Sequence, residues 1–180
     1  EAALAAIVAE CGASAVVWNR RYEPWSRERD ARIKADLTAA GIAARSHNGT
    51  LLREPWEVRT GEGQPYRVFT PFWRQLRSMG VAGRPVPAPD VAVPPAAVPA
   101  GDALADWDLL PRHPDWAGGL RRAWTPGEDG ARRRLAQFLD GGLAGYRSGR
   151  DRPDRAGTSM LSPHLHFGEI SPRAIWAAVE

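Results

Sequence analysis

Cysteine is almost absent from this sequence, and several familiar site motifs are missing. Cys11 is the only cysteine among 180 residues, so neither a disulfide framework nor a thiolate metal site can be built. No Gly-x-Ser-x-Gly elbow, Walker loop or Gly-x-Gly-x-x-Gly turn after a strand occurs, which leaves hydrolase and nicotinamide chemistry without support. His113, His164 and His166 do not have the spacing of a metal site, so packing or capping roles are favoured and no metal is expected.

Long apolar runs and a secretion signal are also lacking. Charge or proline interrupts every apolar stretch well before the roughly 18 to 20 residues that a membrane-spanning helix needs. The first ten residues have no basic segment and no initiator Met, and they have the pattern of a helix. We therefore expect a cytoplasmic protein of which this chain is a piece.

The positive charge of the chain comes mainly from arginine. The net charge is +3, and arginines cluster at 20–21, 121–122, 132–134 and 147–155. Such clusters suit phosphate contacts, although surface arginines that only interact with water explain them equally well. Eight Trp residues are many for this length. Core packing is their plain explanation, and stacking on bases or a cofactor is the alternative.

The order of elements in the first half predicts an α/β fold with a parallel, Rossmann-like sheet. A helix ending near Gly12, a buried strand over 14–18, a helix from Pro24 to Ala40 and a strand over 42–46 follow one another. Helices that cross over between strands produce parallel sheets. Two strands are too few for such a sheet, so its N-terminal part is expected to be incomplete.

The second half predicts a connector and then helices. The Pro- and Ala-rich run over 81–105 is typical of an interdomain linker between domains at 1–80 and 106–180. Thr70-Pro71 predicts the start of a helix over 72–79, and Thr125-Pro-Gly-Glu128 matches a capping box. Ser171-Pro172 predicts a last helix that reaches Glu180.

The segment from Gly157 to Arg173 has the chemistry of a phosphate site. Thr158, Ser159 and Ser162 supply three hydroxyl groups beside backbone N–H groups at a helix start, where negative charge is favoured. Ordinary capping by Ser and Thr before Pro is the alternative. Composition alone does not separate the two.

The order of landmarks along nearly the whole chain resembles that of the DNA photolyase and cryptochrome family. The landmarks are Trp18-Asn19, Arg29-Asp30, Val68 to Phe72, Trp124, Pro126 to Glu128, Tyr146, Arg150-Asp151, Gly157 to Ser159, Leu161-Ser162 and Ser171 to Arg173. We take the closest resemblance to be to class I cyclobutane pyrimidine dimer photolyases. It implies an α/β antenna domain, a linker, and the start of an all-helical domain that binds FAD.

The resemblance also implies roles for individual residues. It places Tyr146 against the flavin cofactor and Arg150 at the backbone of damaged DNA. The residues that it wraps around the FAD phosphates are Thr158, Ser159, Met160, Leu161 and Ser162. Met160 stands where the family often has Arg or Lys, which weakens charge neutralisation. The segment Glu23 to Ser26 lacks the Asn-Glu pair of folate-type members, so of the antenna pigments folate is disfavoured, and a deazaflavin or no pigment fits better.

For function, the resemblance implies light-dependent DNA repair by a deoxyribodipyrimidine photo-lyase. Photoexcited reduced flavin passes an electron to a pyrimidine dimer flipped out of the duplex, and the cofactor carries the difficult chemistry. No catalytic residue is expected within this chain, and the chain alone is expected to be inactive; the full protein is expected to be a monomer. A cryptochrome photoreceptor with little or no repair activity is the alternative, and a scaffold without flavin is a third.

Overall fold

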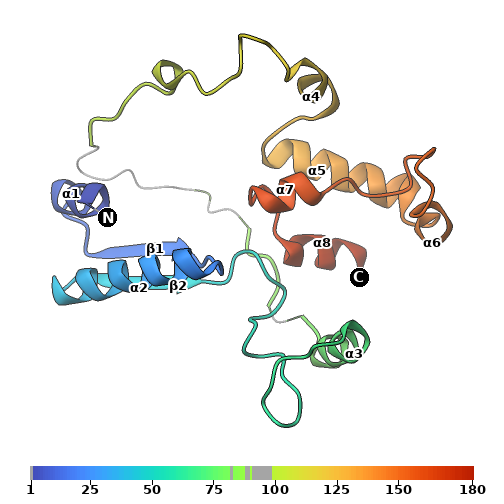
Figure 1. Cartoon of the computed structure of the whole chain (residues 1–180), viewed down its shortest axis with the longest axis horizontal. Helices are drawn as coiled ribbons and strands as arrows, with labels where there is room; N and C mark the ends of the chain where they lie inside the picture. Colours follow the sequence, from blue (N-terminus) through green and yellow to red (C-terminus); the bar gives the residue numbers. More distant parts are fainter. Residues whose placement is uncertain (1, 82, 88–89, 91–98) are drawn as a thin grey trace. The chain divides into compact units, whose positions relative to one another are not determined.

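The computed structural model describes residues 2–81, 83–87, 90 and 99–180, which form two compact units (Figure 1). The first unit contains Glu1–Gly49 and Pro87–Pro111, and the second contains Thr50–Val86 and Arg112–Glu180. Much of the predicted linker, namely residues 82, 88–89 and 91–98, lies outside the described residues. No helix in the described ranges has the length and apolar character needed to cross a membrane.

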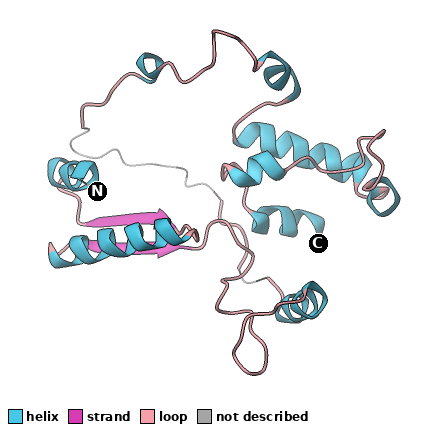
Figure 2. Cartoon of the chain, in the orientation of Figure 1, coloured by secondary structure: helices cyan, strands magenta, loops and turns pink. Residues whose placement is uncertain are grey.

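The first unit contains the predicted parallel pair of strands. Its elements in order are α1 (Ala2–Cys11), β1 (Ala15–Asn19), α2 (Pro24–Ala39), β2 (Ala43–His47) and the short 3-10 helix η1 (Leu104–Trp107). The strands pair in parallel from Ala15↔Ala43 to Asn19↔His47, with α2 as the connection between them (Figure 2). The prediction of a parallel α/β arrangement is therefore confirmed for these elements.

The prediction that the first strand is buried is wrong. Exposed and half-buried residues alternate along both strands, and Val17 is 61% exposed. The described sheet has only two strands, so each has one unpaired edge, and α2 cannot cover both faces. Along α2, Leu37 is buried and Ile33 is half-buried, whereas the C-cap residue Ala40 is exposed.

In the second unit, α3 (Phe69–Met79) begins earlier than predicted. Val68 is its N-cap residue, so Thr70 lies inside the first turn and does not cap the helix. Pro71 is then the third helical residue. Proline is tolerated there because the first four N–H groups of a helix have no acceptor within it.

The rest of this unit is helical (Figure 2). Its elements are α4 (Gly118–Ala123), α5 (Glu128–Gln137), the π-helical turn η2 (Phe138–Gly142), α6 (Tyr146–Gly149), α7 (Ser162–His166) and α8 (Pro172–Val179). As predicted, Ser171 caps α8, because its hydroxyl oxygen accepts a 3.1 Å hydrogen bond from the Ala174 N–H.

The capping box predicted for α5 does not form. The N-cap residue is Gly127, with φ +94° and no side-chain cap, and α5 begins at Glu128. The Thr125 carbonyl instead packs against Gly130, where an added Cβ would lie 1.8 Å from the Thr125 oxygen. The entry into α5 therefore depends on a close backbone approach and not on a side-chain hydrogen bond.

The core of the helical segment is small and is centred on α5. Ala131, Leu135, Leu161 and His164 are each at most 8% exposed. The expectation that the tryptophans pack in a core is wrong, because all eight are exposed or only half-buried in the structure. The most exposed are Trp25, Trp56, Trp107 and Trp116, at 52–68%.

Candidate functional site

The hydroxyl-rich loop before α7 lies beside the end of α5. Thr158, Ser159 and Met160 line a cavity of about 290 Å³ together with residues of α5, of η2 and of the preceding loop. These further lining residues are Arg134, Gln137, Phe138, Gly141, Gly142 and Ala156. Three of the predicted phosphate-binding residues thus meet a wall that sequence reasoning did not include.

The polar groups of this loop are available to a ligand. Within the described part of the chain, no hydrogen bond engages the hydroxyl groups of Thr158, Ser159 or Ser162, or the backbone N–H groups of residues 158–162. Met160 has a φ of +55°, unusual for a residue other than glycine. The backbone turns sharply at Met160 and leaves donor groups without acceptors in the part of the chain that the structure describes.

A close contact between two glycines joins the loop to α6. An added Cβ on Gly157 would lie 2.4 Å from the Gly149 carbonyl oxygen, whereas one on Gly149 would lie 3.4 Å from the Gly157 Cα atom. The two backbones therefore touch at Gly157. This contact fixes the start of the 158–162 loop against the helix that carries Tyr146.

Tyr146 and Arg150 lie on and next to α6. The Tyr146 ring meets the Phe138 ring edge to face at 5.8 Å, and Phe138 also lines the cavity. The Arg150 guanidinium lies 5.6 Å from the centre of the Tyr146 ring and 3.4 Å from a carboxylate oxygen of Asp151. Tyr146 is thus linked to the cavity wall through Phe138, although it does not line the cavity itself.

Leu161 and Ser162 occupy different environments. Leu161 is only 3% exposed, so its side chain packs in the core and only its backbone is available to a ligand. Ser162 is exposed at the first residue of α7 and does not line the cavity. The loop residues predicted together are therefore separated into cavity, core and surface positions.

A buried histidine holds α7 to the start of α5. The predicted packing role of His164 is confirmed, because it is 3% exposed, its Nδ1 lies 2.5 Å from the Glu169 carboxylate, and its ring meets Trp124 edge to face. The hydrogen bond from His164, and then one from the Gly127 backbone, lower the pKa of Glu169. Glu169 therefore connects the turn between α7 and α8 with the N-terminus of α5.

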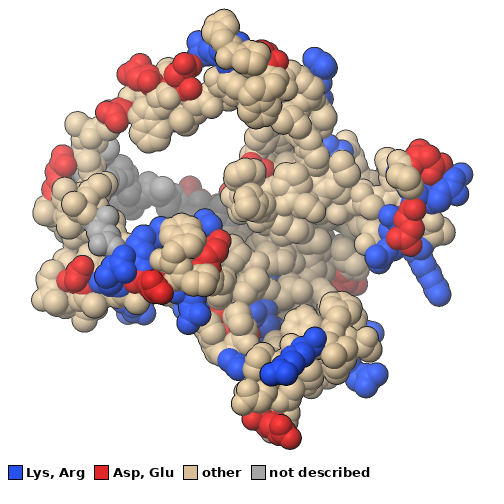
Figure 3. Space-filling model, viewed as in Figure 1, with Lys and Arg blue, Asp and Glu red and all other residues tan. Residues whose placement is uncertain are grey.

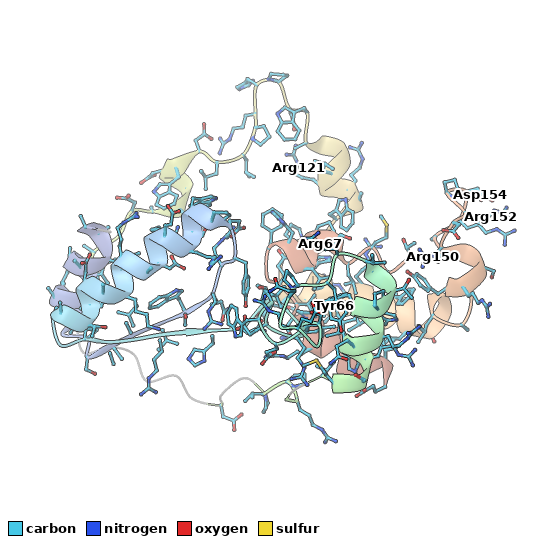
Figure 4. All side chains as sticks on the ribbon, turned by 60° about the horizontal axis from the view of Figure 1, so that its bottom comes forward. Tyr66, Arg67, Arg121, Arg150, Arg152 and Asp154 are labelled. Carbon is cyan, nitrogen blue, oxygen red and sulfur yellow. The ribbon has the colours of Figure 1, made fainter. Side chains whose placement is uncertain are left out.

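The arginine-rich segment over 147–155 is exposed and mixed in charge. Figure 3 shows basic and acidic side chains intermingled over α6 and the loop after it, and Figure 4 shows Arg152 and Asp154 side by side. Arg152 pairs with Asp154 at 2.8 Å, and this hydrogen bond lowers the pKa of Asp154. Four arginines and two aspartates leave this surface positive, with Arg150 55% exposed by side chain.

Sequence reasoning missed the contribution of α5 to the cavity. Arg134 belongs to the arginine run at 132–134, which was considered only as a charge cluster, and Phe138 follows four residues later. A helical projection places Arg134 and Phe138 four residues apart on one face. That shared face could have been found from the sequence. The sequence does not indicate, however, that the 156–160 loop covers it.

Comparison with known proteins agrees with the landmarks. The DNA photolyase family model matches residues 1–90. The chain is 46% identical to a deoxyribodipyrimidine photo-lyase of Agrobacterium fabrum, over 97% of this chain and 36% of that protein. It is 40% identical to cryptochrome-1 of Arabidopsis thaliana, over 99% of this chain and 26% of that protein.

Solved structures show the same relationship. A bacterial class III photolyase from Agrobacterium tumefaciens matches with a TM-score of 0.95 and 45% identity, over 99% of this chain and 37% of that one. A Synechocystis cryptochrome, at 22% identity and a TM-score of 0.65, shares the fold. The expected resemblance to class I is not supported, since the similar structure is a class III photolyase.

The family assignment rests on the first half of the chain and on these relatives together. The chain spans only 36% and 26% of the two relatives' lengths, so it corresponds to a part of each. The family model matches the first half of the chain, which includes the parallel strands and α2. This chain belongs to the DNA photolyase family.

Proposed function

We propose that this chain is part of a deoxyribodipyrimidine photo-lyase of the class III type, which repairs cyclobutane pyrimidine dimers in DNA with light. The observation that carries the proposal is the 45–46% identity with Agrobacterium photolyases over 97–99% of the chain. Such identity across both units indicates a shared activity and not only a shared fold. In this assignment residues 1–80 belong to the antenna domain, 81–105 to the linker and 106–180 to the helical FAD-binding domain.

The residues of the candidate site fit the phosphates of FAD. Thr158 and Ser159 offer unengaged hydroxyl groups at a cavity, and the backbone N–H groups of 158–162 lack protein acceptors among the described residues. Unpaired N–H and O–H donors are the groups that bind phosphate oxygens. We assign Thr158, Ser159 and Ser162 as hydroxyl donors, Met160 and Leu161 as backbone donors, and Tyr146 as a contact of the cofactor.

In this proposal, the role of the described part of the protein is to hold the flavin cofactor and to position the DNA. The bound flavin supplies light-driven electron transfer to the lesion, whereas this part of the chain binds phosphate groups and presents a basic surface. Arg150 is exposed beside Tyr146 and is oriented by that ring, so we assign it to the DNA backbone near the flavin site. Binding of DNA through such arginines weakens as the salt concentration rises.

Flavin content tests the cofactor assignment. The protein that carries this chain is expected to purify with flavin absorbance, and the double substitution Thr158→Ala with Ser162→Ala is expected to reduce the FAD bound per protein. Thr70→Ala is the matched control, because Thr70 is exposed on α3 and makes no capping hydrogen bond. A colourless wild-type protein contradicts the proposal.

Cryptochrome remains a second candidate, supported by the 40% identity with Arabidopsis cryptochrome-1. Repair of a thymine dimer under blue light separates the two functions. Reversal of the dimer by the flavin-loaded protein supports the photolyase assignment. Flavin photoreduction without any dimer reversal moves the protein to the receptor class.

A further inference from the structure

We propose that Arg134 supplies the cation that neutralises the FAD phosphates at the cavity of the 156–160 loop. The inference rests on the proposed function, and it adds a binding residue from α5, a helix outside the loop. The loop itself carries hydroxyl groups but no charge, since residues 156–162 include neither Lys nor Arg. A diphosphate bound by this loop alone keeps its negative charge without a countercharge.

The charge distribution around the cavity singles out Arg134. Among the described residues that line the cavity, Arg134 alone is charged, and no carboxylate competes with a bound anion. Gln137, Thr158 and Ser159 add neutral hydrogen-bonding groups to the lining of the same cavity. Arginine presents five N–H donors in a planar fork that matches phosphate oxygens.

The side chain of Arg134 is already held in place by the protein. Its Nη2 atom donates a 3.2 Å hydrogen bond to the Ala123 carbonyl, and its guanidinium lies 5.3 Å from the centre of the Trp124 ring. The Trp124 ring is itself packed edge to face against the His164 ring, with 6.0 Å between the two ring centres. Among the described residues, only one of the five N–H groups of Arg134 has an acceptor. A pre-ordered cation therefore keeps donors for a ligand, and little conformational entropy is lost on binding.

Neighbouring arginines on α5 do not meet these conditions. Arg132 forms ion pairs with Glu128 at 2.8 Å and with Asp129 at 3.1 Å, on the exposed face of the helix. Arg133 is exposed and does not line the cavity. Arg133 therefore provides a control substitution of the same charge, one residue away on the same helix.

The test compares FAD with riboflavin, which has the same ring system but no phosphate. Both are titrated into the flavin-free, full-length protein, and binding is followed by quenching of flavin fluorescence. Arg134→Gln is expected to weaken FAD binding by about tenfold or more, as loss of a charge-assisted hydrogen bond predicts, and to leave riboflavin binding unchanged. Arg133→Gln is expected to leave both affinities unchanged.

A second substitution distinguishes a charge effect from a structural one. Met160→Arg places a cation on the opposite wall of the cavity, so we expect it to restore FAD binding when combined with Arg134→Gln. Equal losses of FAD and riboflavin affinity without this rescue overturn the inference in favour of a packing role. Wild-type affinity for FAD in Arg134→Gln overturns it as well but leaves the proposed function intact. A wild-type protein that binds neither compound refutes both.

Discussion

Two glycines of the α/β unit and two glycines of the site-bearing segment are required for different physical reasons. Gly12 and Gly41 end α1 and α2 with φ values of +60° and +76°, and an added Cβ at either would meet nothing within 4 Å. Gly130 and Gly157 have no positive φ, but an added Cβ would collide with a backbone carbonyl. Gly12 and Gly41 are therefore required for their backbone conformation, whereas Gly130 and Gly157 are required for close packing of backbones.

The two regions also differ in how their backbone N–H groups are used. In the first unit, strand pairing and α2 use the backbone hydrogen bonds in regular elements. In the helical segment, short elements approach closely at glycines, and the turn over 158–162 leaves its N–H groups unengaged by the described residues. Irregular backbone held rigidly by its surroundings is a common basis for binding sites.

The largest expected effect comes from Gly130→Ala. The new Cβ would lie 1.8 Å from the Thr125 oxygen, so α5 or the segment before it must move. We expect a loss of about 3 kcal/mol or more in the free energy of unfolding, measured by urea denaturation. Gly141→Ala is the control, because nothing lies within 4 Å of its added Cβ; equal stability of the two variants contradicts the steric role.

Gly157→Ala is expected to cost less overall but to act on the site. Its Cβ would lie 2.4 Å from the Gly149 oxygen, and the loop can relieve the clash by moving away from α6. We expect a destabilisation of about 1–3 kcal/mol and faster amide hydrogen exchange over 157–162. Gly149→Ala is the control, because its added Cβ would lie 3.4 Å from the nearest atom, the Gly157 Cα, which is an ordinary contact distance. We expect it to change hydrogen exchange little.

Gly41→Ala measures the conformational requirement in the first unit. No atom obstructs the added methyl group, so the cost is only that of a positive φ, about 1 kcal/mol. Thermal unfolding is the measurement. A cost as large as that of Gly130→Ala would remove the distinction between the two kinds of glycine.

The pair formed by buried His164 and half-buried Glu169 is expected to make the helical segment sensitive to acid. The pKa of Glu169 is lowered by His164, so its contribution to stability is present above the ordinary value of 4.5 and is lost as the pH falls through the folded-state pKa. Glu169→Gln is expected to flatten this part of the stability–pH curve. Glu62→Gln, in the exposed turn at Thr60–Gly63, is the control, and an unchanged curve in Glu169→Gln contradicts the assignment.

The smallest effect on stability is expected from the exposed pair at the entry to α2. A hydrogen bond from Arg21 lowers the pKa of Glu23 to about 2, although both side chains are about half exposed. Arg21→Gln is expected to raise this pKa toward its ordinary value in an NMR titration, with little change in unfolding because water screens the pair. Arg27→Gln is the control, and an unchanged Glu23 pKa shows that the pair does not form in solution.

Much of the local structure follows from residues that act on their immediate neighbours. Gly12, Pro24 and Ser171-Pro172 predicted the ends of helices because they restrict the backbone or supply a cap within one turn. Thr70 and Thr125 failed as predicted caps. Thr70 lies inside the first turn of α3, and at α5 a close approach between the Thr125 carbonyl and Gly130 takes the place of the predicted side-chain cap.

The candidate site was predicted in its composition but not in its arrangement. The hydroxyl groups of Thr158 and Ser159 were evident from the residues, whereas the roles of Arg134 and Phe138 depend on the 156–160 loop, which is distant in the sequence. The ligand roles of the loop residues stay predictions, and the flavin titrations above test them.

The sequence by itself determined the parallel strand–helix–strand order, the starts of α2 and α8 and the hydroxyl-rich loop, because periodicity, proline and capping residues act locally. Only the tertiary structure decided that α5 forms the wall facing this loop, that two glycine backbones touch, and that a single arginine lines the cavity. Those features depend on contacts between segments that lie apart in the sequence, and a local sequence pattern does not contain such contacts.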